Sequence, residues 1–282
     1  MKLLTCLFAC SVAFGQAVAE ENWPAFRGPK ALGVSDNPSL PLEWSDKKNV
    51  EWKVAVPGLG WSNPVVHSGR IYLTTAVSDG EIEKRKPGLY FGGDRKEPIK
   101  HMHQFLVLCL ELKTGDFLWQ KEVLAIRPLT PIHVKNSYAA ETPVTDGERV
   151  YAYFGSHGLY CLDKTGKVLW KKMFKPYKMR NGWGTAASPV LDEGKLIIVN
   201  DNMEDSWAAA YDKVTGRELW KTKRDEPSNW STPYVWHHDG IKELVLTGRN
   251  RTRSYDLSGK ELWNLKWKTR TSIVIPTPFE AH

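Results

Sequence analysis

Short apolar runs, each bounded by a proline or a glycine turn, recur along this chain from residue 64 to its end. One apolar run follows a proline, as at Pro64, and a second follows the next glycine, as at Ile71–Leu73. Proline has no N–H to give to a strand ladder, so it suits the start of a strand. The phrase of Asn, Ser or Thr before Pro occurs at residues 63–64, 142–143, 188–189, 232–233 and 277–278. The pattern predicts repeated pairs of short strands joined by tight turns.

A second phrase ends each unit with an acidic residue, a Thr-Gly or Ser-Gly turn and a Leu-Trp pair. Its copies are Leu110–Trp119, Leu162–Trp170, Tyr211–Trp220 and Tyr255–Trp263. Glycine supplies the positive φ that a tight hairpin needs, and the acidic side chain is expected to accept hydrogen bonds from the turn backbone. The two phrases together therefore predict four strands in each unit. The first follows proline, the second is apolar, the third ends at the acidic residue and the fourth ends at tryptophan.

The chain has 13 tryptophans in 282 residues, and four of them end the repeated phrase. These are Trp119, Trp170, Trp220 and Trp263, which stand 51, 50 and 43 residues apart. A buried tryptophan supplies roughly 150–250 Å² of contact, so we predict that they dock one unit against the next. Cys109 and Cys161 share a third-strand position with Ala210 and Ser254, which predicts small core residues rather than a disulfide or a redox pair.

Four-stranded units that repeat at this period are typical of propeller blades. We therefore predict an all-β protein, a β-propeller of about four complete blades and a partial one. Val50–Val54 is expected to be a fourth strand without its own first three, and residues 273–282 provide about one first strand. Eight blades of about 45 residues would need about 360 residues. The expectation is a truncated form of a seven- or eight-bladed parent.

The phrase that ends each unit resembles the tryptophan-docking motif of PQQ-type repeats, and the blades are PQQ/WD40-like. Such repeats build quinoprotein alcohol dehydrogenases and the propeller lipoprotein of the outer-membrane barrel-assembly machinery, which binds no quinone. Trp23–Pro29 and Asn49–Lys53 are similar to the lead-in of exported PQQ-binding-like repeat proteins. The resemblance implies that a catalytic member would hold PQQ beside a divalent cation, and many such members also have an adjacent cysteine pair. This chain has no adjacent cysteines, and we assign no catalytic residue.

The N-terminus reads as a secretory signal peptide over residues 1–19. Lys2 precedes an apolar stretch, and Ala17-Val18-Ala19 is a small-x-small cleavage site, so cleavage is predicted after Ala19. A lead-in strap is expected over residues 20–50, and the partial propeller over 51–282, with an insertion at about 78–104. No other stretch is long and apolar enough to span a bilayer. The expected location is the periplasm or the extracellular space.

The formal net charge is +7 and the isoelectric point is about 9.1. Lysine and arginine are scattered among aspartate and glutamate, whereas nucleic-acid binding leaves clustered basic patches. We therefore expect a solvated surface and no nucleic-acid partner. The partner would be an unidentified protein or a glycan.

Aromatic and amide side chains recur just before the first strand of each unit, where a propeller has the mouth of its channel. They are Trp61, Asn63, Asn136, Tyr138, Glu141, Asn181, Trp183, Asn229 and Trp230. Aromatic rings with amides and one carboxylate suit a planar or sugar-like ligand, and the alternative is that they only pack the loops. His101 and His103 have no third ligand at a suitable spacing, so no metal site is predicted.

Three functions follow from these observations. The first is an exported, non-catalytic propeller that acts as a binding or assembly scaffold, for which no cofactor is predicted. The alternatives are a dehydrogenase, or its remnant, that uses PQQ with Ca²⁺, and a carbohydrate-binding propeller.

Overall fold

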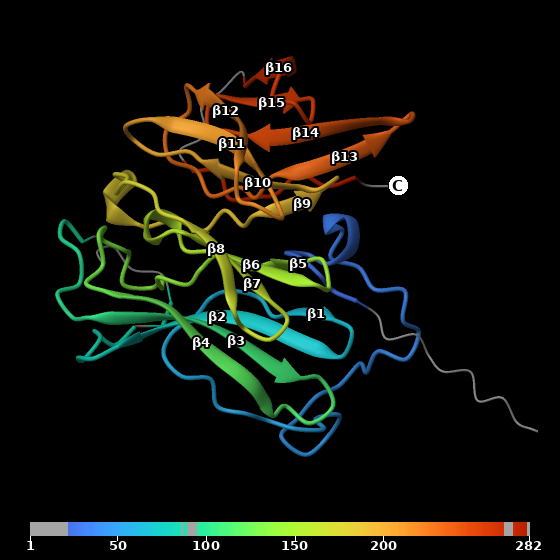
Figure 1. Ribbon diagram of the computed structural model, residues 1–282, viewed down its shortest axis with the longest axis vertical. Coiled ribbons are helices and arrows are strands. Elements are labelled where there is room, and N and C mark those ends of the chain that lie inside the picture. The colour runs from blue at the N-terminus through green and yellow to red at the C-terminus, as the bar shows by residue number, and fades with distance from the viewer. Residues whose placement is uncertain (1–21, 86, 89–94, 268–272, 281–282) are drawn as a thin grey trace, which may run out of the picture.

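The computed structural model describes residues 22–85, 87–88, 95–267 and 273–280, and the proposed signal peptide lies outside this range. Four antiparallel sheets of four strands each follow one another along the chain, and Figure 1 shows them stacked in chain order. Blade 1 comprises β1 (Val65–His67), β2 (Arg70–Ser78), β3 (His103–Glu111) and β4 (Phe117–Ile126), and blade 2 comprises β5 (Val144–Thr145), β6 (Arg149–Tyr153), β7 (Leu159–Asp163) and β8 (Val168–Lys172). Blade 3 comprises β9 (Val190–Asp192), β10 (Lys195–Asn200), β11 (Ser206–Asp212) and β12 (Glu218–Arg224), and blade 4 comprises β13 (Tyr234–His238), β14 (Ile241–Thr247), β15 (Arg251–Tyr255) and β16 (Glu261–Lys266). The prediction of an all-β protein with four-stranded blades is confirmed.

Helical structure is limited to three single turns among the described residues. They are η1 (Pro29–Ala31), η2 (Gly155–His157) and η3 (Arg180–Gly182). No helix in the described part of the chain is long and apolar enough to cross a membrane.

The turn between the third and fourth strands has the chemistry that its sequence predicts. Gly166 has φ 86°. The Asp163 carboxylate accepts hydrogen bonds from the backbone N–H of Thr165 at 2.8 Å and of Lys167 at 3.1 Å. Hydrogen bonds from the Thr165 side chain and backbone lower the pKa of Asp163. The expected acidic-residue turn is thereby confirmed in blade 2.

The apolar core lies between successive sheets, because each blade buries a face against the next. Between blades 1 and 2, for example, Phe105 packs edge-on against Phe154. Cys109 and Cys161 are free and fully buried, each in one of these inter-blade layers. Burial raises the pKa of the Cys109 thiol to about 11 and of the Cys161 thiol to about 12.

The fourth strands do not end at tryptophan as predicted: Trp119, Trp170 and Trp220 are the third residues of β4, β8 and β12, which continue past them. Each of these tryptophans reaches across to the next blade. The indole Nε1 of Trp119 donates to the Lys164 carbonyl at 3.0 Å, and Trp170 and Trp220 donate in the same way to Lys213 and Leu257. Each ring lies over the glycine of the neighbouring turn. Trp263 instead donates to Glu243 of its own blade at 2.6 Å and is 37% exposed.

The segment expected to form a strand at Val50–Val54 is not paired into a sheet, although it behaves like the end of a blade. Trp52 donates to the Leu112 carbonyl at 3.0 Å and covers Gly115, as Trp119 does for blade 2. Trp52 and Val54 also pack on the outer face of blade 1 against Leu108. The strand is missing because the described residues provide no third strand beside it.

Candidate functional site

A cavity lies beside the first strands of blades 2, 3 and 4, along the lead-in strap. The strap begins at Trp23, which forms an isolated antiparallel bridge with Val66 of β1. It then passes β5, where the backbone N–H of Thr145 donates to the Pro24 carbonyl at 2.9 Å. Strap and strands together enclose about 430 Å³, a volume within the range of ligand sites.

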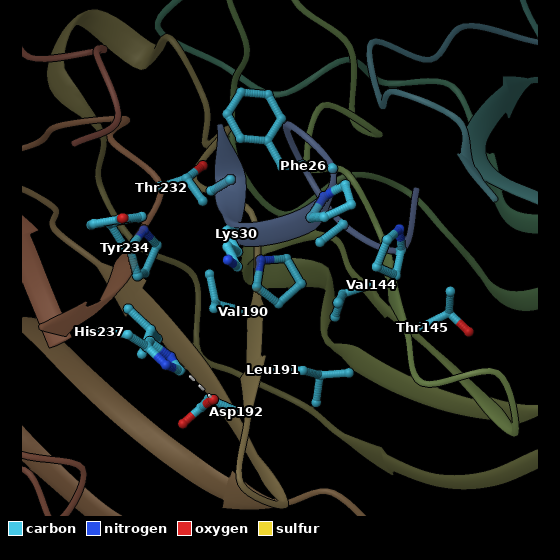
Figure 2. Close-up of a pocket in the computed structure, with 18 of the residues that line it drawn as sticks. Phe26, Lys30, Val144, Thr145, Val190, Leu191, Asp192, Thr232, Tyr234 and His237 are labelled. Atoms are coloured by element: carbon cyan, nitrogen blue, oxygen red, sulfur yellow. Dashed lines mark ion pairs between the residues drawn. The ribbon is translucent and has the colours of Figure 1, made fainter. Parts of the chain in front are cut away.

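The cavity is lined mainly by apolar side chains. The strap supplies Pro24, Ala25, Phe26, Pro29 and Ala31, and the blades supply Val144, Pro189, Val190, Leu191, Pro233, Tyr234 and Val235. Figure 2 shows Phe26 and Thr232 toward one end, and Asp192 and His237 toward the other. Because most of this surface is apolar, an occupant would be held chiefly by burial of apolar groups.

The polar end of the cavity is an ion-pair cluster. One Asp192 carboxylate oxygen lies 3.7 Å from His237 Nε2, and the other lies 3.3 Å from Lys242 Nζ. Asp192 belongs to β9, whereas His237 and Lys242 come from the hairpin of β13 and β14, so the cluster joins blades 3 and 4. Lys30 and Glu280 also line this cavity. No local sequence pattern marks these residues, because Asp192 and Lys242 come together only through blade stacking.

The nine residues predicted as a ligand site lie in the loops before the first strands, and the structure brings some of them together. The rings of Trp183 and Trp230 lie 5.6 Å apart, and the side-chain amide of Asn136 donates to the Trp183 carbonyl at 2.8 Å. Asn181 lies in η3 with φ 52°. The Trp230 indole donates to the Gly184 carbonyl at 2.7 Å.

The remaining predicted residues have separate partners. The Trp61 ring lies 4.4 Å below the Arg85 guanidinium. The Tyr138 hydroxyl donates to the Thr130 carbonyl at 2.9 Å, and the Asn229 amide donates to Asp201. None of the nine lines the 430 Å³ cavity. Their use in a ligand site therefore stays a prediction, and the structure gives most of them contacts within the protein.

A chain of hydrogen bonds links the proline phrases of successive blades. The backbone N–H of Asn63 donates to the Thr142 hydroxyl at 3.1 Å, and that of Thr142 donates to the Ser188 hydroxyl at 3.0 Å. The backbone N–H of Ser188 donates in turn to the Thr232 hydroxyl at 3.1 Å. The Ser or Thr before each proline thus ties its blade to the one before it.

Glu141 is a carboxylic acid buried among these loops, with 2% of its surface exposed. Burial raises its pKa to about 7, although a hydrogen bond from the Thr185 hydroxyl lowers it in part. His157 lines the same small cavity. Burial lowers the pKa of His157 to about 4, and the neutral ring accepts a hydrogen bond from the Leu129 N–H at 3.0 Å. Both groups are therefore held in a neutral form at mildly acidic pH.

Replacing Glu141 with glutamine is expected to remove a pH-dependent loss of stability. Because the folded-state pKa is raised, folded Glu141 holds a proton between about pH 4.5 and 7 that the unfolded chain releases. Its contribution is complete below pH 4.5 and is lost as the pH rises through 7. Urea unfolding should show Glu141→Gln matching the parent protein at pH 4.5 and exceeding it by about 3 kcal/mol at pH 8.

The control for this comparison is Glu148→Gln, an exposed carboxylate with 70% of its side chain accessible. It should differ from the parent by less than about 0.5 kcal/mol at both pH values. A Glu141→Gln variant with the same stability difference from the parent at pH 4.5 and pH 8 would show that folding does not raise the pKa of Glu141.

A fully buried ion pair lies within blade 3, and its arginine also bonds to blade 4. Arg224 Nε and Nη2 donate to the two oxygens of Asp201 at 2.7 and 3.0 Å, and neither side chain is more than 1% exposed. Arg224 Nη1 also donates to the Tyr255 hydroxyl of β15 at 3.1 Å. The sequence offers no local motif for this pair, because Asp201 follows β10 and Arg224 ends β12.

The described residues do not fit a PQQ and cation site. No three His, Cys, Asp or Glu side chains within the described ranges come close enough together to hold a metal ion. Cys109 and Cys161 lie in different inter-blade layers and are not paired. We therefore derive no chemical step through a quinone.

Comparison with known proteins places these blades in a family. The family model described as outer membrane protein assembly factor BamB matches residues 103–275. The BamB of Burkholderia pseudomallei (strain K96243) is 25% identical over 205 residues, which are 65% of this chain and 50% of that protein. The chain therefore spans about half the length of the curated relative that it matches.

Solved structures share the fold at low sequence identity. The quinohemoprotein alcohol dehydrogenase of Comamonas testosteroni superposes with a TM-score of 0.52 at 16% identity, over 87% of this chain and 41% of that one. The quinohemoprotein alcohol dehydrogenase ADHIIG of Pseudomonas putida HK5 gives 0.51 at 14% identity, over 87% and 40%. These two likenesses concern the fold alone, whereas the family model covers more than half of the sequence. This chain belongs to the family of the outer membrane protein assembly factor BamB, built from PQQ-like propeller repeats.

Proposed function

We propose that this protein is an exported, non-catalytic β-propeller that acts as a binding scaffold in the assembly of outer-membrane proteins. The observation that carries the proposal is the match of residues 103–275 to the BamB family. The cavity supports it as well, because it is a mainly apolar groove walled by first strands of three blades, which suits the binding of another chain.

Export is part of the same proposal. The signal peptide of residues 1–19, with cleavage after Ala19, would deliver the lead-in strap and the propeller to the periplasm. We place the insertion at about 78–104, between β2 and β3, and the partner would be a protein of the cell envelope. N-terminal sequencing of the protein recovered from the periplasm should begin at Glu20.

The test of the assembly role is removal of the gene from its natural host. The level of folded outer-membrane barrel proteins, measured by their mobility on gels with and without heating, should fall. Expression of the full chain should restore it. Unchanged barrel levels in the deletion strain would contradict the proposal.

The dehydrogenase alternative and the scaffold proposal predict different effects of PQQ and Ca²⁺ on the thermal unfolding midpoint. Under the scaffold proposal, PQQ with Ca²⁺ leaves the thermal unfolding midpoint of the protein unchanged. A ligand present at about 100 times its Kd would add roughly 2.7 kcal/mol to the folded state. An upward shift of the midpoint would therefore favour a quinoprotein.

A further inference from the structure

The first strand of each blade is an edge strand, because its sheet begins there. Along an antiparallel edge, every second residue points its N–H and C=O away from the sheet. In β1 that residue is Val66, one pair back from the hairpin-closing pair His67 and Arg70. Its N–H and C=O both bond to Trp23 of the strap, each at 2.8 Å. The strap therefore adds to blade 1 as a short extra strand.

The strap also bonds to the edge strand of blade 2 at the equivalent position. Thr145 of β5 stands two residues after Pro143, as Val66 does after Pro64. Its outward N–H donates to the Pro24 carbonyl at 2.9 Å. Two neighbouring blades thus use the same backbone position to hold one extended segment.

Blade 3 offers the same position without an occupant. Leu191 stands two residues after Pro189 and one pair back from the closing pair Asp192 and Lys195. The turns match, since Glu193 and Gly194 have φ 44° and 79°, and Ser68 and Gly69 have φ 48° and 71°. The N–H and C=O of Leu191 must therefore point away from β10, as those of Val66 point away from β2. Across the described ranges, no backbone bond joins Leu191 to a residue outside its sheet.

This open edge lies on the wall of the 430 Å³ cavity. Leu191 lines the cavity, as does Val235 at the equivalent position of blade 4. The facing wall is the strap, with Pro24, Ala25 and Phe26. An occupant of this space would meet backbone donors and acceptors along one side and apolar side chains around them.

We propose that this groove binds an extended polypeptide segment of a partner protein, which adds as a strand to the inner edge of β9 through Leu191. A polypeptide is the ligand whose own N–H and C=O match those of a strand edge, and such strand addition is a known mode of peptide recognition. The apolar lining selects segments rich in small or β-branched apolar residues. The inference deepens the proposed scaffold role, since it names the kind of partner that the scaffold holds.

The first test uses a fluorescent peptide, acetyl-Lys-Val-Ala-Val-Ala-Val-Lys-amide, and the full mature chain. In a β-strand the amides of alternate residues face the same edge. N-methylation of one set, on either the valines or the alanines, should weaken binding at least tenfold in an anisotropy titration. Methylation of the other set should leave the Kd within about threefold. Equal loss with both sets, or no loss with either, would overturn strand addition.

The second test alters the protein at the same position. Leu191→Pro removes the outward N–H at a place where proline is tolerated in an edge strand. Leu191→Ala loses the same side chain but keeps the N–H, and is the matched control. Leu191→Pro should raise the Kd for the peptide at least tenfold above that of Leu191→Ala, because both variants lose the leucine side chain from the groove wall and only the proline variant also loses the N–H. Equal affinities would contradict the proposal, and if Leu191→Pro fails to fold, the N-methylated peptides decide the question.

Three further outcomes distinguish strand addition from the assembly role and from occupation of the groove by a second copy. If the peptide does not bind but gene removal still lowers the folded barrel proteins, the groove proposal falls and the scaffold role stands. If sedimentation shows a dimer that the peptide cannot dissociate, the groove is filled by a second copy and the proposal is wrong. If the peptide binds as described but barrel levels are unaffected, strand addition stands and the assembly role falls.

Discussion

Replacing Arg224 with methionine is expected to lower the free energy of unfolding by about 3–5 kcal/mol. The variant leaves the Asp201 carboxylate buried without its charged partner, since both side chains are at most 1% exposed. The Tyr255 hydroxyl also loses its donor. Because Arg224 both pairs with Asp201 inside blade 3 and bonds to Tyr255 of blade 4, the loss should appear in urea unfolding as a lower midpoint.

Two companion variants make this result specific. Lys164→Met removes an exposed partner of Glu148, 3.4 Å away, and should cost no more than about 1 kcal/mol. The double variant Arg224→Met with Asp201→Leu should recover most of the loss, because replacing both members of a buried pair by apolar groups is often neutral. If Arg224→Met costs no more than Lys164→Met, Asp201 is not buried as the structure has it.

The blade structure could be predicted from the sequence because its determinants are local and repeated. A Thr-Gly turn followed by Leu-Trp sets a hairpin within ten residues, as from Leu162 to Trp170. The small residue at Cys161 then lies opposite Trp170 in the strand register. Such short phrases determine the strands of each blade and the contact with the next blade, and they do so independently of distant parts of the chain.

The cavity and its surroundings could not be predicted, because they depend on how blades and strap come together. Asp192 meets Lys242 across two blades, and Trp23 meets Val66 over more than forty residues. The buried acid Glu141 was included as a ligand candidate. The structure instead gives it a hydrogen bond from Thr185 and a pKa of about 7. The sequence pattern marks Glu141 as a candidate, whereas its raised pKa depends on burial in the folded protein.

The position of the open strand edge also bears on how such a scaffold could work. The inner strands are short, and β9 has only three residues, Val190–Asp192. A short edge limits uncontrolled pairing, and the strap already covers the edges of blades 1 and 2. Among the described residues, open positions then remain at Leu191 of β9 and Val235 of β13, both on the cavity wall, which would permit a partner to bind there without opening the propeller to aggregation.

Replacing Trp170 with alanine is expected to cost roughly 3–5 kcal/mol, the range seen when a packed tryptophan is removed. The ring lies over Gly216 of the blade 3 turn, and its indole N–H donates to the Lys213 carbonyl at 3.2 Å. Blades contact only their neighbours, so stability depends on each interface in turn. The loss should therefore reduce both the midpoint of urea unfolding and its cooperativity.

Trp263→Ala is the matched control, because that tryptophan has the equivalent position in β16 of blade 4 but is 37% exposed and bonds within its own blade. It should cost about 1 kcal/mol and leave the cooperativity of unfolding unchanged. Trp170→Phe should fall between the two, since it keeps a ring over Gly216 but loses one hydrogen bond worth about 1 kcal/mol. If Trp170→Ala and Trp263→Ala prove equally costly, the tryptophans stabilise their own blades. The docking of one blade on the next would then have to come from the proline phrases and the buried pair of Arg224 and Asp201.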